Sequence, residues 1–327
     1  MLYLKGTKIE QTPNGETAYI RCVIAIEASN SKEIFRVYGD DILFNGRYLY
    51  SFEEDILHIH NTYDGKKLRG ITNKNTLTLR GKGVYYDLGV SNNALFLYRV
   101  WSIEIGHPTA IDIIDIYGDI VKTVSFEKKL SYMPTKNNFH DRLFFRSREG
   151  ICIVDLNIDE PRITYLSQFP FSLISNSEAK DIVYILSNEE VYKYNISADK
   201  IIQAASLNEI AASGRHRIVS SRDGSKLLVL VQIYEVEDHG YITKHIFSKV
   251  YFHLFNTNDL SAVCHFYSPI DYSSIDLSYD GLTFYGLTGE IENGTINTVI
   301  DTIDLFTGHV TNRTIMHGIA LYDIYAF

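Results

Sequence analysis

The stretch SRDGSKLLVL (221–230) has a counterpart, SYDGLTFYGL (278–287), 57 residues further along the chain. Both stretches begin with a serine, a spacer and an Asp-Gly pair, and both continue as an alternating apolar run. Asp-Gly supplies the backbone angles of a tight turn, and alternation of apolar and polar residues is typical of a strand. The chain therefore repeats a turn and a strand, which indicates a repeat architecture.

Four further stretches follow the same plan of apolar strand, polar turn and second strand. They are DDILFNGRYLYSF (40–52), VYYDLGVSNNALFLYRV (84–100), MPTKNNFHDRLFFRS (133–147) and FSLISNSEAKDIVYILS (171–187). The turn centres of the six copies lie roughly 39 to 57 residues apart, which brackets the period of about 40–50 residues in four-stranded propeller blades. Each copy continues with a turn, a third strand, another turn and a fourth strand.

The two ends of the chain complement each other. ALYDIYAF (320–327) matches a first strand alone, whereas LYLKGTKIE (2–10), ETAYIRCVIAIEA (16–28) and KEIFRVYG (32–39) match strands two to four. Joining them completes a seventh blade and leaves no unpaired edge strand. The sequence predicts an all-β single domain over 1–327, a seven-bladed β-propeller of four-stranded antiparallel blades closed by 320–327 joining 2–39. The spacing alone leaves six or eight blades open.

The motifs resemble those of known propeller families. SRDGSKLLVL and TIDLFTGHV (302–310) are similar to the blades of YVTN/quinoprotein-like and WD40-like propellers. Asp223-Gly224 and Asp280-Gly281 keep the turn dipeptide, Thr307-Gly308 keeps the later Thr-Gly pair, and no blade carries the Trp-Asp pair of WD40 repeats. The resemblance implies the fold and transfers no active site, since propellers host unrelated functions.

The composition limits the classes of partner and the cellular compartment that we expect for this protein. With 24 tyrosines, 17 phenylalanines and six prolines, the chain is rich in residues that favour strands. A net charge of −9 argues against nucleic acid, which requires a basic face. No segment approaches the ~20 apolar residues of a membrane span, and the three separated cysteines favour a reducing compartment. We therefore expect a cytoplasmic protein with no membrane insertion and no cofactor.

One rim of the predicted propeller is acidic. In this fold, the turns between second and third strands share a rim with the connections from each fourth strand to the next blade. These turns carry Glu16; Glu53, Glu54 and Asp55; Glu104; Glu149; Glu189 and Glu190; Glu235, Glu237 and Asp238; and Glu290 and Glu292. An acidic rim steers a basic partner, although polar hairpin tips also serve solubility alone.

Other candidate binding residues lie on the same rim. The stretches 101–110, 234–247 and 288–297 are predicted to be long loops, which often bind ligands. Trp101 opens the first of them and is either a binding or a packing residue. Arg215, His216 and Arg217 begin a blade, with both arginines on one side of the strand, and either bind an anion or form an inter-blade salt bridge. Tyr272 lies at the corresponding start of another blade.

Catalytic and metal motifs are missing from the sequence. His58 and His60 share one face of a strand, but no third ligand accompanies them by spacing, so cross-strand hydrogen bonding is favoured over a metal. The sequence contains no nucleophile elbow, zinc-protease helix or phosphate-binding loop. The leading hypothesis is a non-enzymatic interaction or scaffold propeller whose acidic, loop-bearing rim binds a protein or peptide partner. A lactonase-like hydrolase with a site on the central channel and a carbohydrate-binding propeller are the alternatives.

Overall fold

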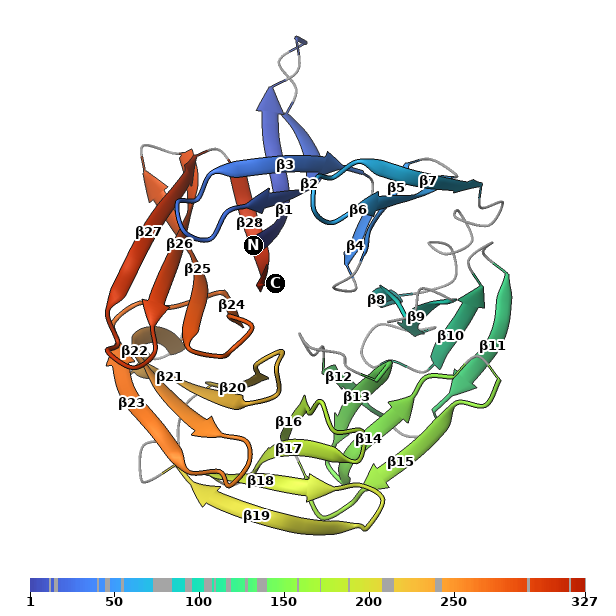
Figure 1. Ribbon diagram of the computed structural model, residues 1–327, viewed down its shortest axis with the longest axis vertical. Coiled ribbons are helices and arrows are strands. Elements are labelled where there is room, and N and C mark those ends of the chain that lie inside the picture. Colours follow the sequence, from blue (N-terminus) through green and yellow to red (C-terminus); the bar gives the residue numbers. More distant parts are fainter. Residues whose placement is uncertain are drawn as a thin grey trace.

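The computed structural model describes residues 1–326 except 12, 15–16, 40, 45–47, 54–55, 73–83, 92–95, 103–107, 109, 116–118, 127–128, 134–139, 158, 171, 188, 208–214, 239–242, 293–294 and 318. At strand positions 9, 11, 41–44, 52–53, 71–72, 84–88, 90, 236–238, 243–245, 290–292 and 295–296 it describes the backbone alone. Within the described part, the chain forms strands β1 to β28, arranged as seven four-stranded antiparallel sheets around a ring (Figure 1).

The strands follow one another in chain order from blade to blade. Blade 1 contains β28 (Ile319–Ala326), β1 (Leu2–Gln11), β2 (Thr17–Ile26) and β3 (Glu33–Tyr38), and blade 2 contains β4 (Asp41–Phe44), β5 (Tyr48–Glu53), β6 (Ile56–Asn61) and β7 (Lys67–Thr72). Blade 3 contains β8 (Val84–Val90), β9 (Phe96–Ser102), β10 (Ala110–Asp115) and β11 (Ile120–Ser125), and blade 4 contains β12 (Ser131–Met133), β13 (Arg142–Ser147), β14 (Gly150–Asp155) and β15 (Arg162–Leu166). Blade 5 contains β16 (Leu173–Asn176), β17 (Ile182–Ser187), β18 (Glu190–Asn195) and β19 (Lys200–Ser206). Blade 6 contains β20 (Arg215–Ser220), β21 (Lys226–Asp238), β22 (Thr243–Asn256) and β23 (Ala262–Ser268), and blade 7 contains β24 (Ser274–Leu277), β25 (Thr283–Glu292), β26 (Thr295–Asp304) and β27 (Val310–His317).

The prediction of a seven-bladed β-propeller is confirmed, including the way the ring closes. Strand β28 pairs antiparallel with β1 from Leu2↔Ala326 to Lys8↔Ile319, so blade 1 takes its innermost strand from the end of the chain and the other three from its beginning. The first strand of each blade lies nearest the centre of the ring and the fourth at the outside (Figure 1). Six or eight blades are thereby excluded.

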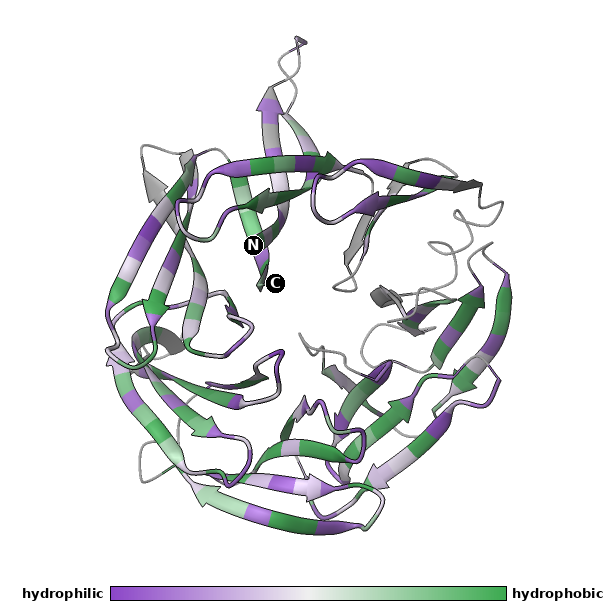
Figure 2. Ribbon diagram, in the orientation of Figure 1, coloured by the Kyte–Doolittle hydropathy of each residue, from purple (hydrophilic) through white to green (hydrophobic). Residues whose placement is uncertain are grey.

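The hydrophobic core lies between the blades. Strand β17 shows why, because alternate side chains face opposite neighbours. Val183 and Ile185 join a buried cluster with blade 4, while Tyr184 and Leu186 join a cluster with blade 6. Both faces of a blade are therefore buried, which explains the nearly continuous apolar runs of the middle strands. Apolar segments recur along the strands around the ring (Figure 2).

Two of the three predicted long loops are wrong, because the residues continue the strands. Residues 234–247 belong largely to β21 and β22, which are 13 and 14 residues long and stay paired as far as Asp238↔Thr243. Residues 288–292 belong to β25 and residues 295–297 to β26, and the two strands stay paired as far as Glu292↔Thr295. Their polar, acidic composition suggested loops, but an exposed hairpin arm needs no apolar face. Most of the third stretch, 101–110, lies outside the described residues.

No helix in the described part of the chain has the length and apolar character needed to cross a membrane. The cysteines carry free thiols, with Cys22 and Cys152 buried and Cys264 half-buried.

Candidate functional site

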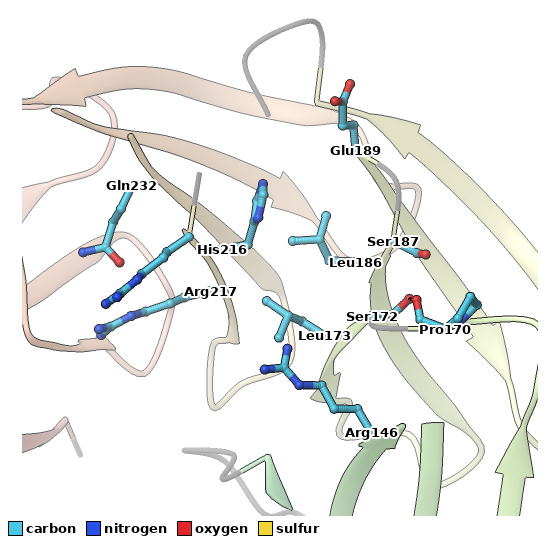
Figure 3. Close-up of a pocket in the computed structure, with 11 residues that line it drawn as sticks. Arg146, Pro170, Ser172, Leu173, Leu186, Ser187, Glu189, His216, Arg217 and Gln232 are labelled. Carbon is cyan, nitrogen blue, oxygen red and sulfur yellow. Dashed lines mark hydrogen bonds between the residues drawn. The ribbon is translucent and has the colours of Figure 1, made fainter. Parts of the chain in front are cut away.

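A pocket of about 530 Å³ opens on the rim where blades 4, 5 and 6 meet (Figure 3). The residues that line it come from separate parts of the chain: Arg146, Pro170, Ser172, Leu173, Leu186, Ser187, Glu189, Arg215, His216, Arg217 and Gln232. They occupy the end of β13, the connection into β16, the β17–β18 turn, the start of β20 and the middle of β21. These positions belong to the rim that the repeat assignment predicts for ligands.

Strand β20 brings its basic residues to this pocket. Because side chains alternate along a strand, Arg215 and Arg217 share one side, and Figure 3 shows His216 and Arg217 pointing in different directions. The Arg215 guanidinium lies 5.3 Å from the centre of the Tyr234 ring. The Arg217 Nη1 atom donates a hydrogen bond of 3.0 Å to the backbone oxygen of Ser273 in blade 7. Two of the pocket's cations are therefore held in place by neighbouring groups.

Asp271, whose charge acts on Arg217, accepts hydrogen bonds from two side chains. Gln232 Nε2 and Tyr234 Oη both donate to the carboxylate of Asp271, the second at 3.4 Å. Burial lowers the pKa of the Arg217 guanidinium, with Asp271 acting in the opposite direction and Arg215 adding to the decrease. Burial and the nearby Asp271 raise the pKa of Tyr234, so this phenol stays protonated and remains a donor.

The pocket is more basic than the chain as a whole. Within the described part, no ion pair joins Arg146, Arg215 or Arg217 to a carboxylate. Glu189 is the one carboxylate among the described lining residues, and in Figure 3 it lies at the opposite end of the pocket from Arg217. An anionic group would complement this lining.

The predicted acidic residues that the structure describes are dispersed. Glu189 lines the pocket, whereas the neighbouring Glu190 accepts a hydrogen bond from Tyr192 Oη. Glu235 is exposed on β21 and accepts a hydrogen bond of 3.0 Å from Ser248 Oγ. Glu54, Asp55 and Glu104, and the side chains of Glu53, Glu237, Asp238, Glu290 and Glu292, lie outside what the structure describes.

Tyr272 and Trp101, the two aromatic residues predicted to bind a partner, lie mainly against other side chains of the protein. Tyr272 is 1% exposed, donates from Oη to Asp301 at 3.1 Å and packs edge-on against Phe252 and Phe284. A side chain this buried offers no surface to a partner. Trp101 is half-buried, with the Arg99 guanidinium 5.8 Å from its ring centre.

Sequence reasoning missed Arg146 and Gln232. Arg146 is the second-to-last residue of β13, which ends at Ser147, so a search confined to the turns passed over it. Extending the search by two residues into each strand would have found Arg146. No signal pointed to Gln232, which lies in the interior of a long apolar strand.

His60, one of the two histidines on β6, hydrogen-bonds within its blade. His60 Nε2 lies 2.8 Å from Ser51 Oγ on β5, and His60 Nδ1 lies 3.1 Å from the backbone oxygen of Gly65. Among the described residues, no cluster of three or more histidine, cysteine or acidic side chains is arranged to hold a metal ion.

Comparisons with known proteins show the architecture. No family model matches the sequence, and no curated protein matches it. A candidate 6-phosphogluconolactonase from Bacteroides fragilis is 12% identical with a TM-score of 0.56, over 99% of this chain and 97% of that one. The likeness is one of fold. Hsv2 from Kluyveromyces lactis is 13% identical with a TM-score of 0.52, over 98% of this chain and 99% of that one. A functionally unknown protein from Desulfotomaculum acetoxidans is 13% identical with a TM-score of 0.55, over 98% and 99%.

Proposed function

We propose that this protein is a non-enzymatic interaction propeller that binds a protein or peptide partner on the rim where the pocket of blades 4–6 opens. The observation that carries the proposal is the pocket itself, which three blades build on the rim of a rigid scaffold. Concave sites with a few convergent polar groups on such scaffolds are the usual place for binding.

Acidic residues are proposed to form the outer part of this surface. The structure describes the side chains of Glu189, Glu190 and Glu235, and the proposed set also contains Glu53, Glu54, Asp55, Glu104, Glu237, Asp238, Glu290 and Glu292, together with Trp101. Charges at the edge of an interface steer encounter and mainly affect the association rate. The preferred partner segment therefore carries basic residues.

The lining contains more groups for binding an anion than for activating water. A hydrolase needs a base, for which the described lining offers Glu189 and His216, whereas its three arginines stabilise anions and do not act as bases. A carbohydrate site usually offers an aromatic platform, and apart from the His216 imidazole the described lining side chains are aliphatic or polar.

A pair of matched double variants tests this function. Glu189→Gln/Glu235→Gln neutralises the rim, and Asp159→Asn/Glu160→Gln removes the same charge from the exposed β14–β15 turn on the opposite rim. Partners captured from a host lysate are identified, and their association rates with each variant are measured at low and high salt. We expect the rim variant to associate several-fold more slowly at low salt and the control to match wild type. Equal rates for the two variants, or no protein retained specifically by wild type, would contradict the proposal.

A further inference from the structure

The basic pocket joins three arginines that the sequence keeps apart. Arg146 comes from β13 of blade 4, and Arg215 and Arg217 come from β20 of blade 6. Figure 3 shows Arg146 reaching toward Leu173 in the middle of the pocket, with Arg217 and Gln232 along another side. In a chain with a net charge of −9, three cations around one cavity form a local reversal of charge.

Among the described residues, no carboxylate forms an ion pair with Arg146, Arg215 or Arg217. Asp271, whose charge favours the ionised form of Arg217, already accepts hydrogen bonds from Gln232 and Tyr234. Glu189 lies at the other end of the cavity (Figure 3). Burial disfavours the charge of Arg217, and the neighbouring Arg215 disfavours it further. An anion bound between the arginines would offset both effects, because a nearby negative charge favours the ionised form of a guanidinium.

Two of the three arginines, Arg215 and Arg217, are also positioned before any ligand arrives. Arg217 is held through Nη1 by the Ser273 carbonyl, and Arg215 lies over the Tyr234 ring. A guanidinium has five donors in a fixed fork, so one hydrogen bond to Ser273 leaves donors of Arg217 for a ligand. Because less side-chain freedom is lost on binding, such preorganised groups bind more tightly than mobile surface arginines.

The other lining residues determine which chemical groups the ligand can carry next to its anion. Leu173, Leu186 and Pro170 supply an apolar wall, and Ser172 and Ser187 supply hydroxyl groups. A volume of about 530 Å³ exceeds the ~30 Å³ that one water molecule occupies in the liquid and accommodates an organic group of several heavy atoms. The cavity therefore fits an anion that is carried on an apolar stem.

We infer that the pocket of blades 4–6 is a receptor for a carboxylate of the partner, presented by its chain terminus or by an acidic side chain next to an apolar residue. Arg146 and Arg217 bind the carboxylate, and Leu173 and Leu186 contact the apolar neighbour. Guanidinium groups match a carboxylate in shape and bind it through paired hydrogen bonds. The inference rests on the proposed function, because the carboxylate belongs to the protein or peptide partner proposed there.

The test uses three synthetic hexapeptides that each carry two lysines. The first ends in leucine with a free carboxylate, the second is the same peptide with a C-terminal amide, and the third is amide-capped with glutamate beside the leucine. Calorimetry at low salt measures their binding to wild type, Arg146→Gln, Arg217→Gln and Arg148→Gln. Arg148 is exposed on the same rim and outside the pocket lining, so its variant is the matched control.

We expect the first or the third peptide to bind, which identifies the source of the carboxylate, and the second to bind at least tenfold more weakly. Arg146→Gln and Arg217→Gln should each weaken binding about tenfold or more, and Arg148→Gln should stay within twofold of wild type. Arg146 is exposed, so its variant is expected to fold, and urea unfolding checks both pocket variants.

Three results would overturn the inference: equal binding of the amide-capped leucine peptide, wild-type affinity in both pocket variants, or binding of inorganic phosphate with failure of both carboxylate peptides. The two proposals fail separately. Loss of partner capture in the Glu189/Glu235 variant together with unchanged capture in the arginine variants rejects the carboxylate receptor alone. The reverse pattern rejects the acidic steering surface alone.

Discussion

At the scale of single residues, the Ser-x-Asp-Gly turn is a self-contained hydrogen-bonding unit. In the first copy, Ser221 Oγ donates to Asp223 Oδ1 at 2.6 Å and accepts from the Lys226 backbone nitrogen at 2.9 Å. Ser278, Asp280 and Thr283 repeat these contacts at 2.6 and 2.9 Å in the second copy. The two turns also touch, because Asp223 N donates to the Tyr279 carbonyl at 3.0 Å. The motif therefore builds each turn and joins neighbouring blades.

Gly281 is expected to be the most demanding position of this turn. Its φ is +69°, and a Cβ atom there would lie 2.5 Å from Lys226 Cβ. Gly281→Ala should lower the free energy of unfolding by at least about 2 kcal/mol, from the left-handed backbone and the forced contact together. Urea unfolding followed by circular dichroism measures the loss.

Gly289 on β25 is the matched control, since a Cβ there meets no atom within 4 Å. Gly289→Ala should leave stability unchanged or raise it by up to about 1 kcal/mol, because alanine is favoured over glycine in a strand. If both alanine variants lost the same stability, the backbone angle and the packing at Gly281 would not be the cause.

At the scale of elements, a buried charged ladder crosses blade 3. Arg99 on β9 faces Asp112 on β10, which faces Thr123 on β11. Arg99 donates through Nε at 3.2 Å and through Nη2 to Asp112 Oδ2, and Thr123 Oγ1 donates to Oδ1 at 2.7 Å. Arg99 and Asp112 are 2% and 1% exposed, so each charge depends on the other.

Asp112→Asn should destabilise the protein by about 3–5 kcal/mol, because it removes the carboxylate that faces the buried Arg99 guanidinium. Glu33→Gln breaks the half-exposed pair that Glu33 forms with Arg36 and should cost less than about 1 kcal/mol. Chemical denaturation of both variants gives the comparison. A loss below 1 kcal/mol for Asp112→Asn would show that Arg99 finds another partner.

At the scale of the whole molecule, the ring depends on its last strand. Ile324 of β28 is fully buried in the cluster between blades 7 and 1. Asp276 of β24 accepts a hydrogen bond of 2.8 Å from the Ala326 backbone nitrogen, and Ser274 donates to Asp323 at 2.7 Å. The closing strand is therefore anchored to blade 7 as well as to β1.

Ile324→Ala should lower the unfolding free energy by about 2–5 kcal/mol, and Tyr322→Ala, at a half-exposed position on the same strand, by no more than about 0.5 kcal/mol. Trp101 is the one tryptophan and reports on blade 3, while circular dichroism reports on all blades. If the ring unfolds as a single domain, both probes give the same loss. Transitions that separate between the probes would contradict this.

Several features of the fold could be predicted from the sequence because they are local. The turn at Asp223-Gly224 and the apolar run LLVL lie within ten residues of one another, and their repetition along the chain predicts four-stranded blades. The closure by β28 could be predicted from the same pattern, because the end of the chain supplies the first strand of a blade and its beginning supplies the other three. The extended arms of β21–β22 and β25–β26 were misassigned because polar strands and polar loops share a composition.

The candidate site was only partly predictable. Arg215 and Arg217 were found because they lie close together on one strand, but nothing local linked them to Arg146, which lies 69 and 71 positions earlier in the chain. Tyr272 begins its blade as predicted, yet its ring turns inward against Phe252 and Phe284. The sequence by itself determined the strands, the turns and the closed ring, because these depend on short-range patterning. Only the tertiary structure decided which charges meet in the pocket and which aromatic rings are buried. Packing between the blades sets the distances between these side chains, and those distances do not follow from the spacing of the residues along the sequence.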